Sequence, residues 1–279
     1  MAMAYAAVWF CFLSIFFNLI SLGIAAIRVR PGLMPLPPPR AAPGVSVVRP
    51  LCGLDNFCEE TLQSSFELDY PSYEIIFCFA RATDPAGDEK VSANPKLNNC
   101  VGGWTRPATI GSFSPMANVL MPKDYIQHLL MSWRHRSGLV CSMPLGSRPG
   151  NRWAELECAF LNTFEARWQY CAEAFGMGFA QGKSMLSRRE VMDKGGGIRA
   201  LGAEIAEDAA STKLVRSLRL DVNLVDSPFE QPLGLSRLSR HMSEAIARGA
   251  IAAQNLSVVS YARNHRRRGV ALPCGGLPL

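Results

Sequence analysis

The chain has 279 residues, of which 48% are hydrophobic and 19% charged, and its formal net charge is +6. This length accommodates one sizeable domain with a buried core plus an anchor. Basic residues are not interleaved with aromatic ones, which argues against nucleic-acid binding. The nine cysteines include no CxxC pair and no metal-site spacing, and the chain is too long to need disulfides for stability, so we interpret them as reduced thiols of a cytosolic domain.

An uncharged apolar run opens the chain. Tyr5–Ile27 contains no charged residue, and its 23 residues extend about 35 Å as a helix, enough to cross a bilayer core of about 30 Å. No Lys or Arg precedes the run, whereas Arg28 and Arg30 follow it at once. A cleaved signal peptide, the alternative, shows the opposite arrangement. We therefore predict a single-pass anchor over residues 1–30, with the N-terminus outside and the remaining chain in the cytosol.

A proline-rich segment and a cluster of basic residues follow the anchor. Residues 31–43 contain six prolines, which stiffen the chain and predict an extended linker. Arginines at this end of the chain are expected to lie near anionic lipid; they are Arg28, Arg30, Arg40 and Arg49. We predict one domain over residues 44–235. Residues 236–279 are basic and then contain Pro and Gly, which predicts a divergent, disordered tail.

Strands and helices alternate in the predicted domain. Val45–Leu51 and Tyr73–Ala80 are apolar runs typical of buried strands. Asn56–Phe66 between them predicts a helix, for which Asp55 is a suitable N-cap. A strand–helix–strand unit of this length implies parallel strands with helices on the faces of the sheet. The predicted fold class is therefore α/β, with a Rossmann-like sheet.

Later segments continue the same alternation. The further predicted strands are Gly138–Leu145, Lys183–Ser187 and Asp221–Val225. The further predicted helices are Trp153–Phe175 and Ile205–Leu218. Four apolar side chains recur every four residues in the first of these helices, which predicts a stripe facing the core; they are Leu156, Phe160, Phe164 and Trp168. Thr105–Pro115 is rich in Thr, Ser, Gly and Pro, and its composition predicts a loop.

Acidic residues stand where a ligand of such a sheet would bind. Ligands of open α/β sheets lie outside the carboxyl ends of the strands, which here are Leu51–Asp55 and Ala80–Asp84. Taken alone, each acid also has a structural interpretation. Asp84 precedes a proline as in many turns, Asp55 suits a helix cap, and Asp208 in an acidic first turn complements the helix dipole. Local sequence leaves both interpretations open.

Four sequence words occur together and resemble one enzyme family, the ceramide glucosyltransferases. They are GVSVVRPLCGLD (Gly44–Asp55), FELDYPSYEIIFC (Phe66–Cys78), NPKLNN (Asn94–Asn99) and AEIAED (Ala203–Asp208). The resemblance implies a GT-A glycosyltransferase fold, a UDP-glucose donor, a lipid acceptor at the membrane bilayer and a Mg²⁺ or Mn²⁺ cofactor. The implied acceptor is ceramide, with a hopanoid-type lipid as an alternative.

The resemblance also implies roles for individual residues. Asp208 ends the IAED word, whose aspartate is the expected general base for the lipid hydroxyl. Asp84 and Asp55 are expected on the nucleotide-sugar side, and Lys96 is placed to approach the diphosphate. These roles follow from the positions of the residues in the family words, and the local sequence does not establish them.

The chain departs from the family pattern at several points. Met116 stands where the family carries an aspartate that binds metal and diphosphate, and a thioether is a poor ligand for Mg²⁺ or Mn²⁺. The chain between Pro85 and Asn94 is shorter than in the family, and the Q/R-x-x-R-W word expected after Phe229–Gly234 is absent. These departures support a second interpretation, a catalytically defective and membrane-tethered member of the family.

Overall fold

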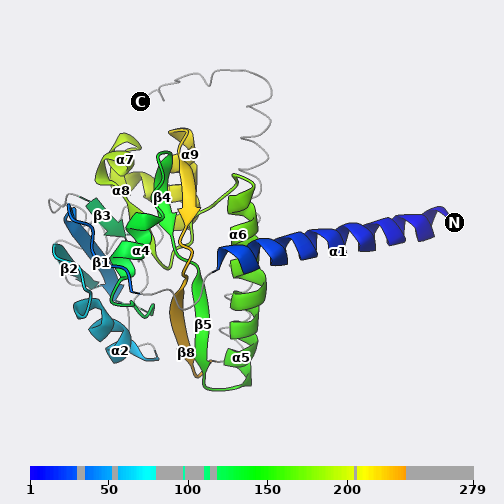
Figure 1. Cartoon of the computed structure of the whole chain (residues 1–279), viewed down its shortest axis with the longest axis horizontal. Coiled ribbons are helices and arrows are strands. Elements are labelled where there is room, and N and C mark those ends of the chain that lie inside the picture. Colours follow the sequence, from blue (N-terminus) through cyan, green and yellow to red (C-terminus); the bar gives the residue numbers. More distant parts are fainter. Residues whose placement is uncertain are drawn as a thin grey trace.

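The computed structural model describes residues 1–29, 35–51, 56–79, 97, 110–113, 118–203 and 206–236. Figure 1 shows a layered α/β domain from which one long N-terminal helix projects. The described residues therefore include the predicted anchor and most of the predicted domain.

Six strands form the central sheet, in the order β2-β1-β3-β6-β4-β7. β1 pairs in parallel with β2 and with β3, and β4 pairs in parallel with β7. β6 runs antiparallel between β3 and β4, so the sheet is mixed. The α/β prediction is confirmed. The bounds are β1 Val45–Leu51, β2 Tyr73–Phe79, β3 Ile110–Phe113, β4 Ser137–Cys141, β6 Met185–Ser187 and β7 Asp221–Leu224.

The helix after β1 begins later than predicted. It consists of α2 (Cys58–Gln63) followed by the 3-10 turn η1 (Ser64–Phe66), and its N-cap is Phe57 rather than Asp55. Phe57 adopts a left-handed conformation, with φ 57°. The preceding Asn56 donates from Nδ2 to the carbonyl oxygens of Leu233 and Leu235, at 2.6 and 2.9 Å. These contacts with a distant segment set the start of the helix, so local capping preference did not locate it.

Two strand predictions were wrong in an instructive way. The predicted loop Thr105–Pro115 contains β3, whose backbone pairs with β1 on one side and β6 on the other. Pairing with two neighbours outweighs the weak strand propensity of an Ile-Gly-Ser-Phe segment. The single strand predicted over Gly138–Leu145 is two strands, β4 and β5 (Pro144–Pro149). Ser142 separates them, because its N–H donates to Ser184 O and its Oγ accepts the N–H of Phe229.

A small second sheet lies beside the central one. It contains β5 and β8 (Phe229–Gly234), which pair in parallel. Arg148 on β5 forms an ion pair with Glu60 of α2, with 2.7 Å between Nη1 and Oε1. Both side chains are partly exposed, so the pair contributes little to stability but joins the second sheet to α2.

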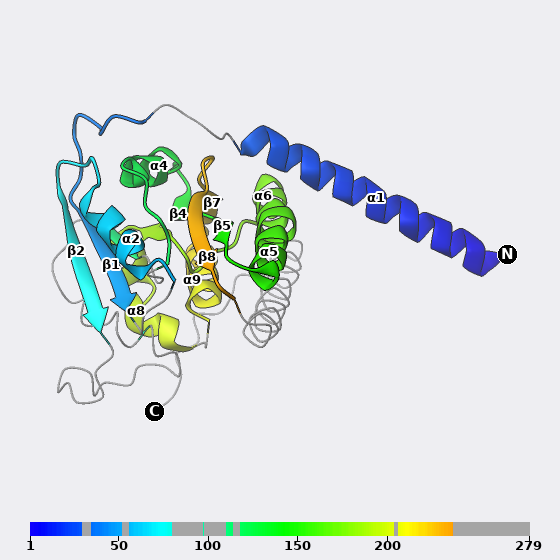
Figure 2. The same ribbon diagram turned by 90° about the horizontal axis from the view of Figure 1, so that it is seen from below.

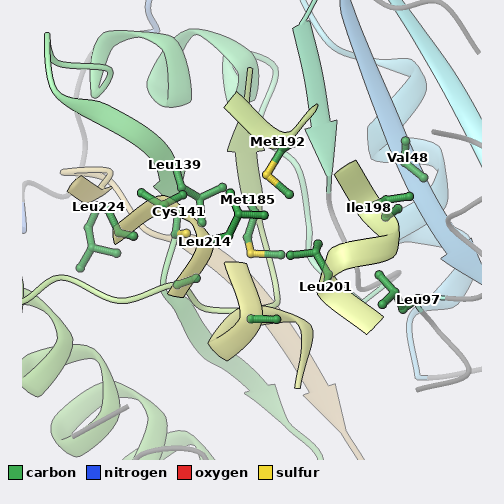
Figure 3. Packing of buried hydrophobic residues seen from close by; sticks show 14 of the residues in the cluster. Val48, Leu97, Leu139, Cys141, Met185, Met192, Ile198, Leu201, Leu214 and Leu224 are labelled. Atoms are coloured by element: carbon green, nitrogen blue, oxygen red, sulfur yellow. The ribbon is translucent and has the colours of Figure 1, made fainter. Parts of the chain in front are cut away.

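Buried apolar side chains lie on both faces of the central sheet. One cluster lies between the sheet and the helices α7 (Arg189–Lys194), α8 (Gly197–Ala200) and α9 (Glu207–Ser217), and Figure 3 shows its centre. The other lies under α4 (Tyr125–Met131). Alternate residues of β1 serve the two clusters, since Val48 belongs to the first and Val47 to the second. Helices on both faces of a sheet are the arrangement that the sequence predicted.

A continuous helical column, residues Arg152–Ala174, packs on the second sheet. It consists of α5 (Arg152–Ala159), the π-helical segment η3 (Phe160–Glu165) and α6 (Ala166–Ala174). The predicted helix is therefore present, but its predicted core stripe was wrong: Leu156 and Phe164 are 50% and 51% exposed. Asn162 fixes the orientation of the column by accepting from Gly146 N and donating to Gly146 O. The opposite face, with Ala154 and Leu161, is the buried one.

The N-terminal helix α1 (Ala2–Arg28) is attached to the domain at its C-terminal end. Among the described residues it is the one helix long and apolar enough to cross a membrane. Arg167 of the column donates from Nη2 to Asn18 Oδ1 at 2.9 Å, and Arg28 pairs with the buried Glu173 at 2.7 Å. Figures 1 and 2 both show α1 passing beside α6 and then projecting away from the domain.

Candidate active site

Asp208 is the predicted site residue that lies within the described ranges. Asp55, Asp84, Lys96 and Met116 lie outside them, so their predicted roles stay predictions. Asp208 is the second residue of α9, which follows an extended Ala206. Glu207 and Asp208 occupy the first turn, where acidic side chains complement the helix dipole as the sequence predicted. The helix itself begins at Glu207, two residues after the predicted Ile205.

Hydrogen bonds join the start of α9 to the segment before β6. Thr212 Oγ1 donates to the carbonyl oxygen of Asp208 and accepts the N–H of Ala180, each at 2.8 Å. A Cβ atom added at Gly182 would lie 3.2 Å from Glu207 Oε1 and 3.6 Å from Asp208 Oδ2. The absence of a side chain at position 182 therefore allows the backbone to approach both carboxylates closely.

The Asp208 carboxylate is buried and only weakly stabilised in its charged form. The residue is 8% exposed. Desolvation by burial, reinforced by the neighbouring Glu207 charge, raises the pKa of Asp208 from 3.8 to about 6. Backbone N–H groups, including that of Ala209 at 2.7 Å from Oδ1, oppose this pKa shift. An acid with a pKa near neutrality is suited to accept and release a proton.

The segment that approaches Asp208 emerges at the carboxyl ends of the parallel strands, as the register of β6 shows. Met185, the first residue of β6, pairs with Phe113 at the end of β3 and with Cys141 at the end of β4. The residues just before Met185 therefore emerge at the end of the sheet where open α/β folds bind ligands. Lys183 in this segment donates to Asn118 Oδ1 at 3.4 Å. A cation thus lies on the same segment as Gly182, which approaches Asp208.

A second cation, Arg49, is buried in β1 of the same sheet. It was expected near lipid as part of the basic cluster, but the residue is 0% exposed in β1, so that prediction was wrong. Its guanidinium donates to Thr61 O at 2.8 Å, to Ser65 Oγ and to Val119 O at 3.4 Å. Desolvation lowers the pKa of Arg49 to about 10. The only sequence signal of this buried arginine was the presence of a charged residue within a valine-rich strand.

Metal ligands are not gathered in the part of the chain that the structure describes. Within the described ranges, no group of three or more His, Cys, Asp or Glu side chains is arranged to hold an ion. The predicted metal position at Met116 lies outside those ranges. We therefore derive no chemical step through a metal from this geometry.

The sequence matches the profile described as Glycosyl transferase family 21 over residues 13–89 and 86–252. The chain belongs to glycosyl transferase family 21. Ceramide glucosyltransferase 3 of Caenorhabditis elegans is 26% identical over 193 residues, which are 60% of this chain and 41% of that protein. Ceramide glucosyltransferase 1 of the same organism is 25% identical over 202 residues, which are 64% of this chain and 43% of that protein. The chain spans less than half the length of these curated relatives.

A solved structure shares the fold of this family 21 chain. The mannosyltransferase PcManGT from Pyrobaculum calidifontis, solved in complex with GDP-Man and Mn²⁺, superposes with a TM-score of 0.56. It is 14% identical in sequence, and the match covers 88% of this chain and 72% of that one. At this identity the likeness shows the fold alone. The predicted family and the predicted GT-A-like fold are both confirmed.

Proposed function

We propose that this family 21 chain transfers glucose from UDP-glucose to ceramide or a related membrane lipid, with Asp208 as the general base. The similarity to ceramide glucosyltransferases supports the donor and the acceptor. The observation that carries the proposal is the Asp208 carboxylate. It is buried, its pKa is raised to about 6, and it lies beside the segment that emerges at the carboxyl edge of the sheet.

In the proposed reaction the lipid hydroxyl loses its proton to Asp208. The hydroxyl oxygen then attacks the anomeric carbon of glucose from the side opposite the diphosphate. The new carbon–oxygen bond forms as the bond to the diphosphate breaks, UDP departs and the configuration inverts. A base with a pKa of about 6 is largely ionised at pH 7, yet it is more basic than an ordinary aspartate. Asp84, Asp55 and Lys96 are proposed on the nucleotide side.

A divalent cation is part of the proposal at the level of the family. The Mn²⁺ bound in PcManGT supports a Mg²⁺ or Mn²⁺ requirement. Such an ion, when bound, neutralises charge on the diphosphate leaving group. No step is assigned to it here, because the described residues hold no ligand cluster.

The test is a transfer assay with purified full chain, radiolabelled UDP-glucose and ceramide in vesicles. We expect a labelled glycolipid, and we expect Asp208→Asn to lower kcat by about 10² to 10⁴, the usual contribution of general base catalysis. A hopanoid acceptor in parallel vesicles distinguishes the lipid classes. Unchanged transfer by Asp208→Asn would refute the assigned base, and transfer of another sugar would refute the donor.

Met116 favours a second candidate, a family member that binds nucleotide without turnover. Its thioether replaces the expected oxygen ligand, which weakens Mg²⁺ or Mn²⁺ binding. In that case UDP stabilises the chain against heat, Mn²⁺ adds nothing, and Met116→Asp restores a further rise in Tm with Mn²⁺. If the unaltered chain already shows a rise in Tm with Mn²⁺, the defective interpretation of the metal site is wrong.

We also propose the cellular arrangement predicted from the sequence. Residues 1–30 form the single-pass anchor, 31–43 the linker, 44–235 the catalytic domain on the cytosolic side, and 236–279 the tail. The exposed, apolar length of α1 supports the anchor, since large apolar side chains along it are exposed, among them Trp9, Phe12 and Ile15. The orientation follows from Arg28 and Arg30 after the span.

A further inference from the structure

The outer face of the helical column is apolar and exposed over several turns. The column stripe consists of Trp153, Leu156, Phe160 and Phe164. Three of its members are 42%, 50% and 51% exposed, in the order Trp153, Leu156 and Phe164. Phe160 is partly buried and stacks on Phe164 with 5.2 Å between ring centroids. Contiguous apolar patches on a protein surface mark a contact with a partner or a membrane.

Charge is excluded from this face between Leu156 and Phe164. The single Asp, Glu, Lys, Arg or His within those residues is Glu157, which is 4% exposed and points into the protein. Its Oε2 accepts from Ser236 Oγ at 3.2 Å. The uncharged face is therefore about 12 Å long at the usual helical rise. A solvent-facing helix would normally carry charged side chains there.

The stripe lies beside the segment of α1 that leaves the domain. Arg167 of α6 bonds to Asn18, and Arg28 of α1 pairs with Glu173 of α6, so the last turns of α1 pack against α6. Figures 1 and 2 together show that α1 runs crosswise to the column and projects on the side away from the two sheets. The column packs on β5 with its other face, through Gly146 and Asn162. The exposed face therefore points toward the side on which α1 projects.

We propose that the column stripe rests in the interface of the lipid bilayer that α1 spans. A helix crosswise to a spanning helix lies along the membrane plane, which is the position of an interfacial amphipathic helix. The stripe lies on the side of the domain on which α1 projects, and the exposed side chains of α1 are mostly apolar as well, which supports lipid over another protein as its occupant. Trp153 at one end of the stripe is of the type enriched at the headgroup level.

This contact brings the proposed base close to the lipid, and this step rests on the proposed function. Glu165 follows Phe164 directly and accepts from Gln181 Nε2 at 2.6 Å. Gln181 precedes Gly182, whose backbone approaches Asp208. One short segment therefore connects the membrane-facing stripe to the carboxylate. A lipid hydroxyl at the headgroup level reaches the base while its acyl chains stay in the bilayer.

The experiment measures tryptophan quenching by brominated lipids in full chain reconstituted into phosphatidylcholine–phosphatidylglycerol vesicles. The contribution of each tryptophan to the quenched fluorescence is the difference in quenching between the unaltered chain and the variant in which that tryptophan is replaced by Phe. Trp9→Phe reports the exposed part of α1, Trp153→Phe the stripe, and Trp133→Phe a half-buried control beside α4 that contacts Arg188. We expect shallow bromine atoms to quench the Trp153 component at least about twofold more than the Trp133 component.

Different quenching results distinguish contact with lipid from contact with a second copy of the chain. Quenching of Trp9 without quenching of Trp153 shows that α1 is inserted and overturns the contact of the stripe with lipid. A dimer in detergent that Phe164→Asp dissociates, with Trp153 unquenched in vesicles, assigns the stripe to a second copy instead. Quenching needs no turnover, so Asp208→Asn must leave it unchanged. Loss of glycolipid synthesis with normal Trp153 quenching would refute the proposed function and leave the membrane contact standing.

Discussion

At the scale of single residues, the charged form of Asp208 opposes folding. Its pKa is about 6 in the folded chain and near 3.8 when exposed, so the folded state binds more protons between these values. The stabilising contribution of the protonated carboxyl is complete below pH 3.8, falls as pH rises and is lost above pH 6. A shift of about 2 pKa units corresponds to about 3 kcal/mol. The chain thus retains a destabilising group at the position where the proposed chemistry needs a base.

The first prediction concerns replacement of this group by its neutral isostere. Asp208→Asn is expected to raise the free energy of unfolding at pH 8 by up to about 3 kcal/mol, because the buried charge is removed. The gain should shrink as pH falls from 6 to 4. Urea unfolding at several pH values measures it. The exposed Asp226→Asn is the matched control, and an equal gain there would contradict the explanation.

The second prediction concerns the neighbouring charge. Glu207 raises the pKa of Asp208, so Glu207→Gln should move the acidic midpoint of the kcat profile below pH 6. The variant should then retain a larger fraction of its plateau kcat at pH 5 than the unaltered chain does. A pH–rate profile with ceramide as acceptor measures the shift. An upward movement of the midpoint would show that Asp208 is not the titrating base.

The sequence predicts a role for Asp208 but not its chemical state. The IAED word leads to the proposal of Asp208 as the base, whereas its pKa depends on burial and on the backbone of Gly182, 26 residues earlier in the chain. Arg49 shows the same limit. Its position after the anchor predicted a lipid-facing arginine, yet its neighbours in space, Ser65 and Val119, bury it. Contacts between distant segments decide both cases.

At the scale of elements, periodicity predicted the helical column but not the direction of its apolar face. A spacing of four residues gives the same stripe whether a protein core or lipid lies opposite it. The side was decided by Asn162, whose amide bonds the backbone of Gly146, and by Cys158 and Leu161, which pack against the same glycine. β1 needed no such information, since a continuous valine-rich run predicts a buried strand directly, and its bounds agree residue for residue.

The third prediction concerns the junction of α1 with the column. Glu173 is 7% exposed, pairs with Arg28 and accepts from the N–H of Leu224 at 3.2 Å. Glu173→Ala leaves Arg28 without its buried partner and should lower the free energy of unfolding by about 3 to 5 kcal/mol. Asp226→Ala removes the exposed partner of the same arginine and should lower it by less than about 1 kcal/mol. Denaturant unfolding in detergent compares them, and equal losses would refute the explanation.

At the scale of the whole molecule, the order of the strands was beyond sequence reasoning. The strand–helix–strand unit predicted the parallel pair β1–β2, but nothing local shows that β6 enters antiparallel between β3 and β4. That insertion positions the residues before Met185 at the carboxyl edge of the sheet. Fold class and family were predictable from sequence, whereas the geometry that sets Asp208 beside this edge depends on pairing across more than 70 residues between β3 and β6.

The fourth prediction concerns the orientation of the whole chain. Arg28 and Arg30 follow the span and no basic residue precedes it, so the N-terminus should lie outside. In inside-out vesicles an N-terminal epitope tag should resist added protease, whereas a tag placed after Leu279 should be cleaved. Detergent should expose the N-terminal tag as well. Cleavage of that tag in intact inside-out vesicles would reverse the assigned orientation.

The double attachment of α1 has a consequence for acceptor choice. Because the domain contacts α1 at both Asn18 and Arg28, the angle between them is restricted. If α1 spans the bilayer as proposed, the domain keeps one tilt and one height above the acyl chains, and the distance from the hydrocarbon boundary to the Asp208 carboxylate is fixed. Under the proposed function, we expect lipids whose hydroxyl lies at that depth to be accepted, and lipids whose taller headgroup carries the hydroxyl past the base to be rejected.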